Sequence, residues 1–250
     1  MDDPTLLRYS RHVLLEAIGI EGQERFSRAR VLVVGAGGLG SPAALYLAAA
    51  GVGQLVLFDG DVVDLTNLQR QILHTTARIG QPKATSAAQT LAALNPLVAI
   101  EAHDRRLGAQ ELAALLPGID VVLDCSDNRA TRYAVNRACV AAAVPLVWGS
   151  ASGFSGQLAV HDLRRAGEPC YACLFPEGPG EDEPCATTGV FAPLTGVIGA
   201  LQAAEALRAI SAFGEPRSGR LLTVDGRDMV FQQLQFARDP HCPVCSVRGN

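Results

Sequence analysis

The chain has 250 residues, 48% of them apolar, and a formal net charge of −4 at pH 7. These values fit one α/β domain with a sizeable core, and the weakly acidic balance argues against nucleic acid as a partner. The N-terminus lacks a basic segment followed by an apolar one, and the longest apolar stretches, such as 43–52, are too short to span a bilayer. We therefore expect a cytoplasmic protein with no membrane partner.

The first part of the chain alternates short apolar runs with helical patterns. Alternation of this kind is typical of a parallel sheet with helices on both faces. In chain order, the sequence predicts an amphipathic helix over 6–20, a strand over 31–34, a helix from Ser41 closed by Gly51, a strand over 54–58, a polar loop over 59–71, a helix over 82–94, a strand over 98–102, a helix over 111–116, a strand over 121–123, a helix over 129–143 and a strand over 145–148.

The pattern changes after Gly149. The sequence predicts an antiparallel strand over 157–161, a long loop over 164–188, a strong helix over 193–210 and a hairpin over 219–236 that turns at Asp225-Gly226. No repeat or low-complexity linker divides the chain. We therefore expect a single domain, with a Rossmann-like parallel sheet continued by antiparallel strands. Residues 1–150 would form its parallel half, and residues 151–250 its mostly antiparallel half.

A glycine-rich turn follows the first predicted strand. The residues Gly35, Gly37, Gly38 and Gly40 give the pattern G-x-G-x-x-G, and Asp59 ends the next strand. Such glycines allow backbone N–H groups to approach phosphate at a helix N-terminus, and the acid can accept hydrogen bonds from a ribose. NAD, FAD, SAM and ATP all fit these features, so the turn leaves the nucleotide open.

A second motif places cationic groups near the expected phosphates. It comprises the run from Asn67 to Gln71, which contains Arg70, and the run from Gly80 to Lys83. Lys83 is the only lysine of the chain and lies where a helix should begin. Chemistry at a phosphate needs such charge, whereas hydride transfer does not. The alternative is a solvated lysine on the surface.

An acidic motif, Asp124-Cys125-Ser126-Asp127-Asn128, ends the strand over 121–123. Ligands of open parallel sheets bind beyond the carboxyl ends of the strands, where a carboxylate facing phosphates can hold Mg²⁺. Asp127 is the candidate for this role. The alternative is that Asp127 or Asn128 only caps the following helix.

Four of the seven cysteines form two C-x-x-C pairs, Cys170/Cys173 and Cys242/Cys245. A single pair could be a redox site, but two pairs flanked by Pro or Gly, neither expected to open a helix, favour structural zinc. A closed site with four thiolates leaves no position for catalysis. Cys185 lies in a polar loop, and the sequence alone does not separate a nucleophile from an accident of composition.

Taken in order, these motifs resemble the MoeB/ThiF family of bacterial E1-like adenylyltransferases. The resemblance covers nearly the whole chain, and the ordered set is far more specific than the glycine turn alone. It rests on RYSRHVLL (8–15), GAGGLGSP (35–42), FDGDVVDLTNLQRQ (58–71), GQPK (80–83), DCSDN (124–128), CYACLFPE (170–177) and CATTGVFAPLTGVIGALQAAEALR (185–208).

The resemblance implies ATP-dependent adenylation of the C-terminal glycine of a ubiquitin-like sulfur carrier, MoaD-like or ThiS-like, for molybdopterin or thiamine biosynthesis. A separate donor, a cysteine desulfurase or a rhodanese, would supply the sulfur. The chain would form a homodimer in which Arg11 reaches the neighbouring subunit's phosphates, and the four paired cysteines would hold zinc. Residues 1–150 would be the nucleotide-binding half, and residues 151–250 the carrier-binding and zinc half. The residues expected to bind ATP and magnesium are Gly35, Gly37, Gly38, Gly40, Asp59, Asp61, Asn67, Gln69, Arg70, Lys83, Asp127 and Asn128.

The charges agree with this reaction. A carboxylate that attacks the α-phosphorus adds negative charge to an anionic centre, and Arg11, Arg70, Lys83 and a Mg²⁺ on Asp127 would offset it. No general base is needed, because the carboxylate is already ionised at pH 7. Two alternatives are an NAD(P)-dependent oxidoreductase, which leaves Arg70 and Lys83 idle, and a non-catalytic partner subunit, which should have lost its charged residues.

Overall fold

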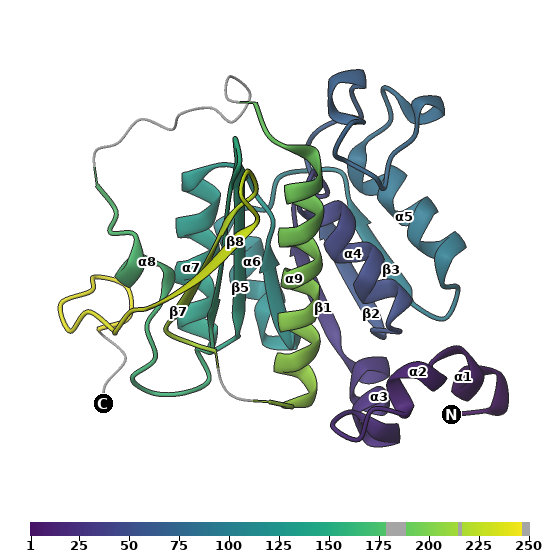
Figure 1. Ribbon diagram of the computed structural model, residues 1–250, viewed down its shortest axis with the longest axis horizontal. Helices are drawn as coiled ribbons and strands as arrows, with labels where there is room; N and C mark the ends of the chain where they lie inside the picture. The colour runs from purple at the N-terminus through teal and green to yellow at the C-terminus, as the bar shows by residue number, and fades with distance from the viewer. Residues whose placement is uncertain (179–188, 215–216, 247–250) are drawn as a thin grey trace.

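The computed structural model describes residues 1–178, 189–214 and 217–246. These residues contain one sheet of eight strands in the order β3-β2-β1-β4-β5-β6-β7-β8 (Figure 1). The strands are β1 (Arg30–Val34), β2 (Gln54–Phe58), β3 (Ala99–His103), β4 (Val121–Asp124), β5 (Leu146–Ser152), β6 (Ser155–His161), β7 (Arg220–Asp225) and β8 (Val230–Gln235).

The two halves of the sheet differ in direction. The strands β3, β2, β1, β4 and β5 pair in parallel, whereas β6, β7 and β8 continue the sheet in antiparallel pairs. The predicted fold class is therefore confirmed. The strand order reverses between β1 and β4, and such a switch point opens a crevice at the carboxyl ends of the strands.

Helices pack on both faces of the sheet. Side chains alternate along β1, so that Val31 and Val33 join the core with α4 (Gly40–Ala49) and α9 (Ala192–Ser211), while Leu32 and Val34 join the core with α7 (Arg129–Ala142). The remaining helices are α1 (Asp3–Arg8), α2 (Ser10–Val13), α3 (Gly19–Arg28), α5 (Lys83–Leu94), α6 (Ala109–Leu115) and α8 (Tyr171–Leu174), with 3₁₀ turns at Leu65–Asn67, Thr76–Arg78 and Leu116–Gly118.

The predicted N-terminal helix over 6–20 is wrong in its bounds. The segment forms α1 and α2, and α3 then begins at Gly19, which has a φ of +59°. Tyr9 lies between the first two helices, and its buried ring packs against Gly51 at the end of α4. This packing turns the chain at a point where the apolar periodicity by itself favours one continuous helix.

Smaller differences occur in the second half. The loop expected over 164–188 contains α8, and its residues 179–188 lie outside the described part of the chain. Strand β5 continues to Ser152, four residues past its predicted end at Trp148, because it pairs with β6 along its whole length. No helix of the described residues is long and apolar enough to cross a membrane.

Helices α4 and α9 cross at Gly199, and this contact requires glycine. A Cβ atom at Gly199 would collide with the carbonyl oxygen of Leu39, at the start of α4. Gly196, one turn earlier on α9, has no atom within 4 Å of the position of a Cβ. The two glycines of one helix therefore have different roles.

We expect Gly199→Ala to destabilise the fold by about 1–3 kcal/mol, because the helices must move apart or the backbone must shift. Gly196→Ala is the matched control, and its better helix propensity should stabilise the chain by up to about 1 kcal/mol. Chemical denaturation of both variants measures the difference. Equal stability of the two variants would contradict the close packing at Gly199.

Candidate nucleotide-binding site

A cavity of about 510 Å³ opens at the carboxyl ends of β1, β2 and β4. Its volume lies within the usual range of small-molecule sites, about 300–1,000 Å³. The structure brings together most of the side chains that the sequence singled out. The candidate residues that line the cavity are Gly35, Gly37, Gly38, Asp59, Asp61, Asn67, Gln69, Arg70, Lys83, Asp127 and Asn128.

The glycine turn lies against the neighbouring strand end. Gly35 has a φ of +95°, and a Cβ there would come within 2.9 Å of the Cys125 carbonyl oxygen. Gly40 does not line the cavity, although the sequence grouped it with the binding residues. A Cβ at Gly40 would collide with the carbonyl oxygen of Gly35, so Gly40 allows α4 to pack closely against the turn.

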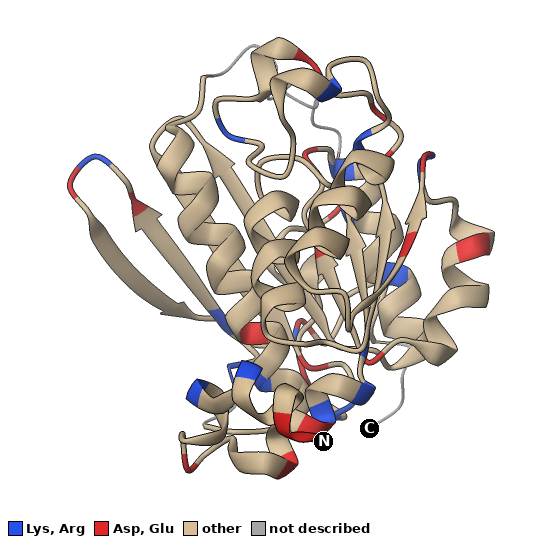
Figure 2. Ribbon diagram, turned by 90° about the vertical axis from the view of Figure 1, so that its right-hand side faces the viewer, with Lys and Arg blue, Asp and Glu red and all other residues tan. Residues whose placement is uncertain are grey.

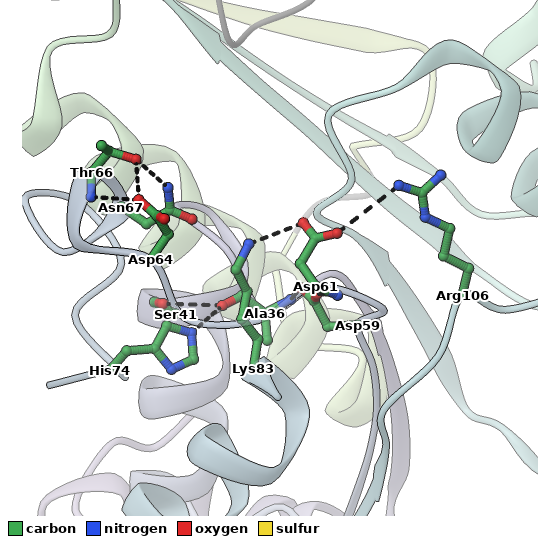
Figure 3. Close-up of polar contacts among 10 residues, drawn as sticks. All are labelled: Ala36, Ser41, Asp59, Asp61, Asp64, Thr66, Asn67, His74, Lys83 and Arg106. Carbon is green, nitrogen blue, oxygen red and sulfur yellow. Dashed lines mark hydrogen bonds and ion pairs between the residues drawn. The ribbon is translucent and has the colours of Figure 1, made fainter. Parts of the chain in front are cut away.

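Asp59 supports the turn from the end of β2. One carboxylate oxygen accepts the N–H of Ala36 at 2.7 Å, and the other accepts the N–H of Asp61 at 2.9 Å (Figure 3). Burial raises the pKa of Asp59, while these hydrogen bonds and the charge of Lys83 act in the opposite direction. Through its two hydrogen bonds, the Asp59 carboxylate holds the loop after β2 beside the expected ribose position.

Lys83 is buried, with only 5% of its surface exposed, and it is the first residue of α5. Its Nζ lies 3.1 Å from a carboxylate oxygen of Asp61, and the guanidinium of Arg106 lies 3.9 Å from the other oxygen (Figure 3). The alternative of a solvated surface lysine is therefore wrong. Two cations converge on one carboxylate at the cavity wall, as expected where an anionic ligand binds.

The helix cap after β4 comes from Asn128. Its side-chain oxygen accepts the N–H of Thr131 at 2.9 Å, at the start of α7. Asn128 thus caps α7 and lines the cavity as well, and its role in binding stays a prediction. Asp127 lines the cavity but does not provide this cap.

Sequence reasoning missed several cavity residues. Arg132 points from α7 to the carbonyl oxygen of Ser126, at 3.1 Å, and its guanidinium lies over the ring of Trp148. The sequence did contain a signal for Arg132. It lies four residues after the cap residue Asn128, and residues four apart lie on the same face of a helix. The other missed residues include Thr66, Arg106, Leu107, Ser126, Thr131, Ala151, Ser152, Val190 and Thr195, of which the last four come from the second half of the chain.

The four paired cysteines form one cluster. Their sulfur atoms all lie within 4.8 Å of one another, with 3.7 Å between Cys170 and Cys242 and 3.4 Å between Cys173 and Cys245. Four thiolates at about 2.3 Å from a tetrahedral Zn²⁺ would be about 3.8 Å apart, so the cluster fits zinc. One expectation is wrong: Cys170 occupies the N-cap position of α8, so the first pair does open a short helix.

Besides Gly40, one described candidate for the nucleotide site, Arg11, does not line the cavity. Arg11 is exposed on α2, and this helix lies at the end of the sheet opposite the glycine turn (Figure 1). Cys185 lies outside the described residues. Their proposed roles stay predictions.

A glycine turn, a buried lysine and an acid at a strand end are typical of nucleotide-binding α/β proteins. The ThiF family model matches residues 9–244, and the chain belongs to this family. The fold is similar to that of MccB from E. coli, with a TM-score of 0.84 at 23% identity over 96% of this chain and 74% of that one.

Three curated relatives match over almost their full length. The chain is 46% identical to the molybdopterin-synthase adenylyltransferase of Escherichia coli, covering 98% of both chains. It is 47% identical to the sulfur carrier protein ThiS adenylyltransferase of the same organism, covering 98% of this chain and 97% of that protein. It is also 47% identical to the SAMP-activating enzyme E1 of Haloferax volcanii, covering 100% and 92%.

The cap at Asn128 gives a testable expectation. Asn128→Ala removes the acceptor for the Thr131 N–H and should lower the free energy of unfolding by about 1 kcal/mol. Asn128→Asp keeps a capping oxygen and should stay near the wild-type stability. Urea unfolding of the three proteins measures this, and an alanine variant as stable as the wild type would contradict a capping role.

Proposed function

We propose that this chain, an E1-like adenylyltransferase, transfers AMP from ATP to the C-terminal glycine of a ubiquitin-like sulfur carrier. The names of the relatives support the reaction class, since those proteins are adenylyltransferases of molybdopterin synthase and of ThiS. The observation that carries the proposal is Lys83, a buried cation beside the glycine turn on the cavity wall. This is a site for chemistry at phosphate.

In the proposed reaction, a carboxylate oxygen of the carrier attacks the α-phosphorus of ATP. The bond from this phosphorus to the bridging oxygen of the β-phosphate breaks, and pyrophosphate leaves. Lys83 and Arg70 offset the charge that builds on the phosphates, and backbone N–H groups of the glycine turn bind them. Asp127 would hold Mg²⁺, which would supply further positive charge against the phosphates.

The second half of the chain supplies the side on which a carrier tail would enter. The cavity is bordered there by Ala151, Ser152 and Val190, whose small side chains leave room for a glycine terminus. Near the mouth, the exposed rings of Phe154 and Phe191 contact each other in a tilted arrangement, with centroids 5.4 Å apart. Phe231 of β8 is exposed as well. We assign this apolar surface to the folded part of the carrier protein.

The decisive measurement is carrier-dependent exchange between ATP and pyrophosphate, run with purified MoaD-like and ThiS-like proteins. The wild-type chain should catalyse exchange only when one of these carriers is present. This assay also reports which carrier the chain uses. An absence of exchange with every ubiquitin-like carrier, despite ATP binding, would contradict the proposed acceptor.

Lys83→Arg tests the phosphate site within that assay. A guanidinium keeps the charge, but its planar fork does not fit the buried position of a compact ammonium. We expect the exchange rate to fall at least about tenfold, with a melting temperature close to the wild type. An unchanged rate would show that charge alone suffices and would contradict the requirement for a compact ammonium at this position.

Zinc is the metal that we propose for the cysteine cluster, with a structural role. Elemental analysis of the purified protein should give about one Zn²⁺ per chain. Replacing Cys242 and Cys245 by serine should abolish metal binding and destabilise the fold. Metal-free wild-type protein with normal stability and activity would contradict this role.

We also propose a homodimer in which Arg11 completes the neighbouring subunit's site. Arg11→Ala and Asp127→Ala homodimers should each be nearly inactive. When the two variants are refolded together, mixed dimers contain one intact site, since one chain supplies Arg11 and the other Asp127. Random assortment should then restore about a quarter of the wild-type exchange activity. If verified mixed dimers stay inactive, Arg11 does not act in trans.

The remaining parts of the proposal concern sulfur. The adenylated carrier would next be converted to a thiocarboxylate, which needs a source of sulfur. We assign that role to a separate cysteine desulfurase or rhodanese. Cys185 stays a candidate for a covalent intermediate. Neither part is needed for the adenylation step, which uses only ATP, Mg²⁺ and the carrier carboxylate.

A further inference from the structure

A buried histidine connects the two elements that flank the expected phosphates. His74 has 6% of its surface exposed and lies in the loop before α5. Its Nε2 lies 2.9 Å from the carbonyl oxygen of Ala36, in the glycine turn, and its Nδ1 lies 3.0 Å from the hydroxyl of Ser86, on α5. Figure 3 shows the ring beside Ala36, with Lys83 nearby.

The partners fix the state of the ring. A carbonyl oxygen can only accept, so Nε2 carries the proton and donates it to Ala36. In the neutral ring, Nδ1 then accepts from the hydroxyl of Ser86. Burial lowers the pKa of His74, which favours this neutral form. Ser86 lies one turn after Lys83 on the same face of α5, so the ring links the glycine turn to the helix that carries the lysine.

Ala36 is held on both sides of its Cα atom. Its N–H donates to Asp59 at 2.7 Å, and its carbonyl oxygen accepts from His74 at 2.9 Å and more weakly from Ser41 at 3.5 Å. Two peptide planes of the turn are therefore fixed. With the Ala36 carbonyl turned toward His74, the next amides of the turn are free to face the cavity.

The loop that carries His74 is itself tied to α5. The guanidinium of Arg78 donates to the carbonyl oxygen of Ser86 at 2.8 Å, and the hydroxyl of Thr90 donates to the carbonyl oxygen of Leu73 at 2.7 Å. The loop and α5 thus form one unit, and His74 is the side chain in it that bonds to the glycine turn.

We propose that His74 is a positioning residue for phosphate binding, which holds the glycine turn in register with Lys83 through the bonds to Ala36 and Ser86. The inference rests on the proposed function, because it takes the phosphates of ATP to lie between these elements. His74 contacts no phosphate itself. Its loss should weaken binding of the nucleotide more than it affects the carrier.

The test compares variants that differ in the bond to Ala36. His74→Leu removes it, whereas His74→Gln places an amide N–H near the position of Nε2. Calorimetric titration with a non-hydrolysable α,β-methylene analogue of ATP and Mg²⁺, without carrier, measures affinity. We expect the leucine variant to bind about fivefold to tenfold more weakly, as for the loss of one buried hydrogen bond, and the glutamine variant to bind within about twofold of wild type.

His161→Leu is the matched control for a merely structural effect. His161 is also a buried histidine that bonds to a backbone carbonyl oxygen, that of Pro169 at 3.0 Å, and it does not line the cavity. The control should lose thermal stability, as His74→Leu does, but should keep its affinity for the nucleotide. Equal affinity of His74→Leu and wild type, or equal weakening by the leucine and glutamine variants, would overturn the inference.

Ser86→Ala covers the case in which His74→Leu does not fold. It keeps the ring but breaks the link to α5, and we expect binding of the analogue to weaken by about twofold to fivefold. In the exchange assay, the KM for ATP should rise while the KM for the carrier stays constant. Unchanged binding would overturn the link to Lys83. If the wild type itself does not bind the analogue, the proposed function fails and the role of His74 fails with it, whereas wild-type affinity that His74→Leu leaves unchanged overturns the role of His74 alone.

Discussion

The close approach of two backbones at the glycine turn is the constraint on which the site depends. The carbonyl of Cys125 faces the position where Gly35 would carry a Cβ, and the carbonyl of Gly35 faces Gly40 in the same way. Because no side chain fits at either contact, β1, β4 and α4 meet tightly at the switch point of the sheet. The cavity lies above this junction, and the same glycines leave the amides of the turn accessible to a ligand.

Much of this arrangement follows from local sequence. The strands β1, β2 and β4 are short apolar runs buried on both faces, and their ends are marked by Gly35, Asp59 and Asp124. The carboxyl ends of parallel strands share one edge, so residues far apart in the chain were expected to meet there. This argument and the family resemblance together predicted eleven of the residues that line the cavity. Residues named only from their motif, such as Gly40, turned out to pack against backbone instead.

Other features depend on tertiary contacts that periodicity does not record. The N-terminal segment reads as one helix, yet it bends where Tyr9 packs into the gap left by Gly51. Arg106 lines the cavity because it packs closely against the loop after β2. This approach is possible because Gly60 in that loop has no side chain. His74 gave no signal either, since a lone histidine in a polar loop fits no ligand spacing. Its role becomes visible only once the Ala36 carbonyl and Ser86 are seen on opposite sides of its ring.

The charges of the site also explain why a lysine persists in an arginine-rich chain. A buried ammonium needs an anionic partner, and in the structure that partner is Asp61, whose side chain is 57% exposed. An exposed carboxylate can turn toward solvent at small cost, so a phosphate could replace it beside Lys83. Arg106, 86% exposed, approaches the same carboxylate from the solvent side. The buried cation is thus compact and fixed, whereas the exposed cation is broad and mobile enough to follow a ligand. The buried position requires the compact ammonium of Lys83, whereas the exposed position accepts the planar guanidinium of Arg106.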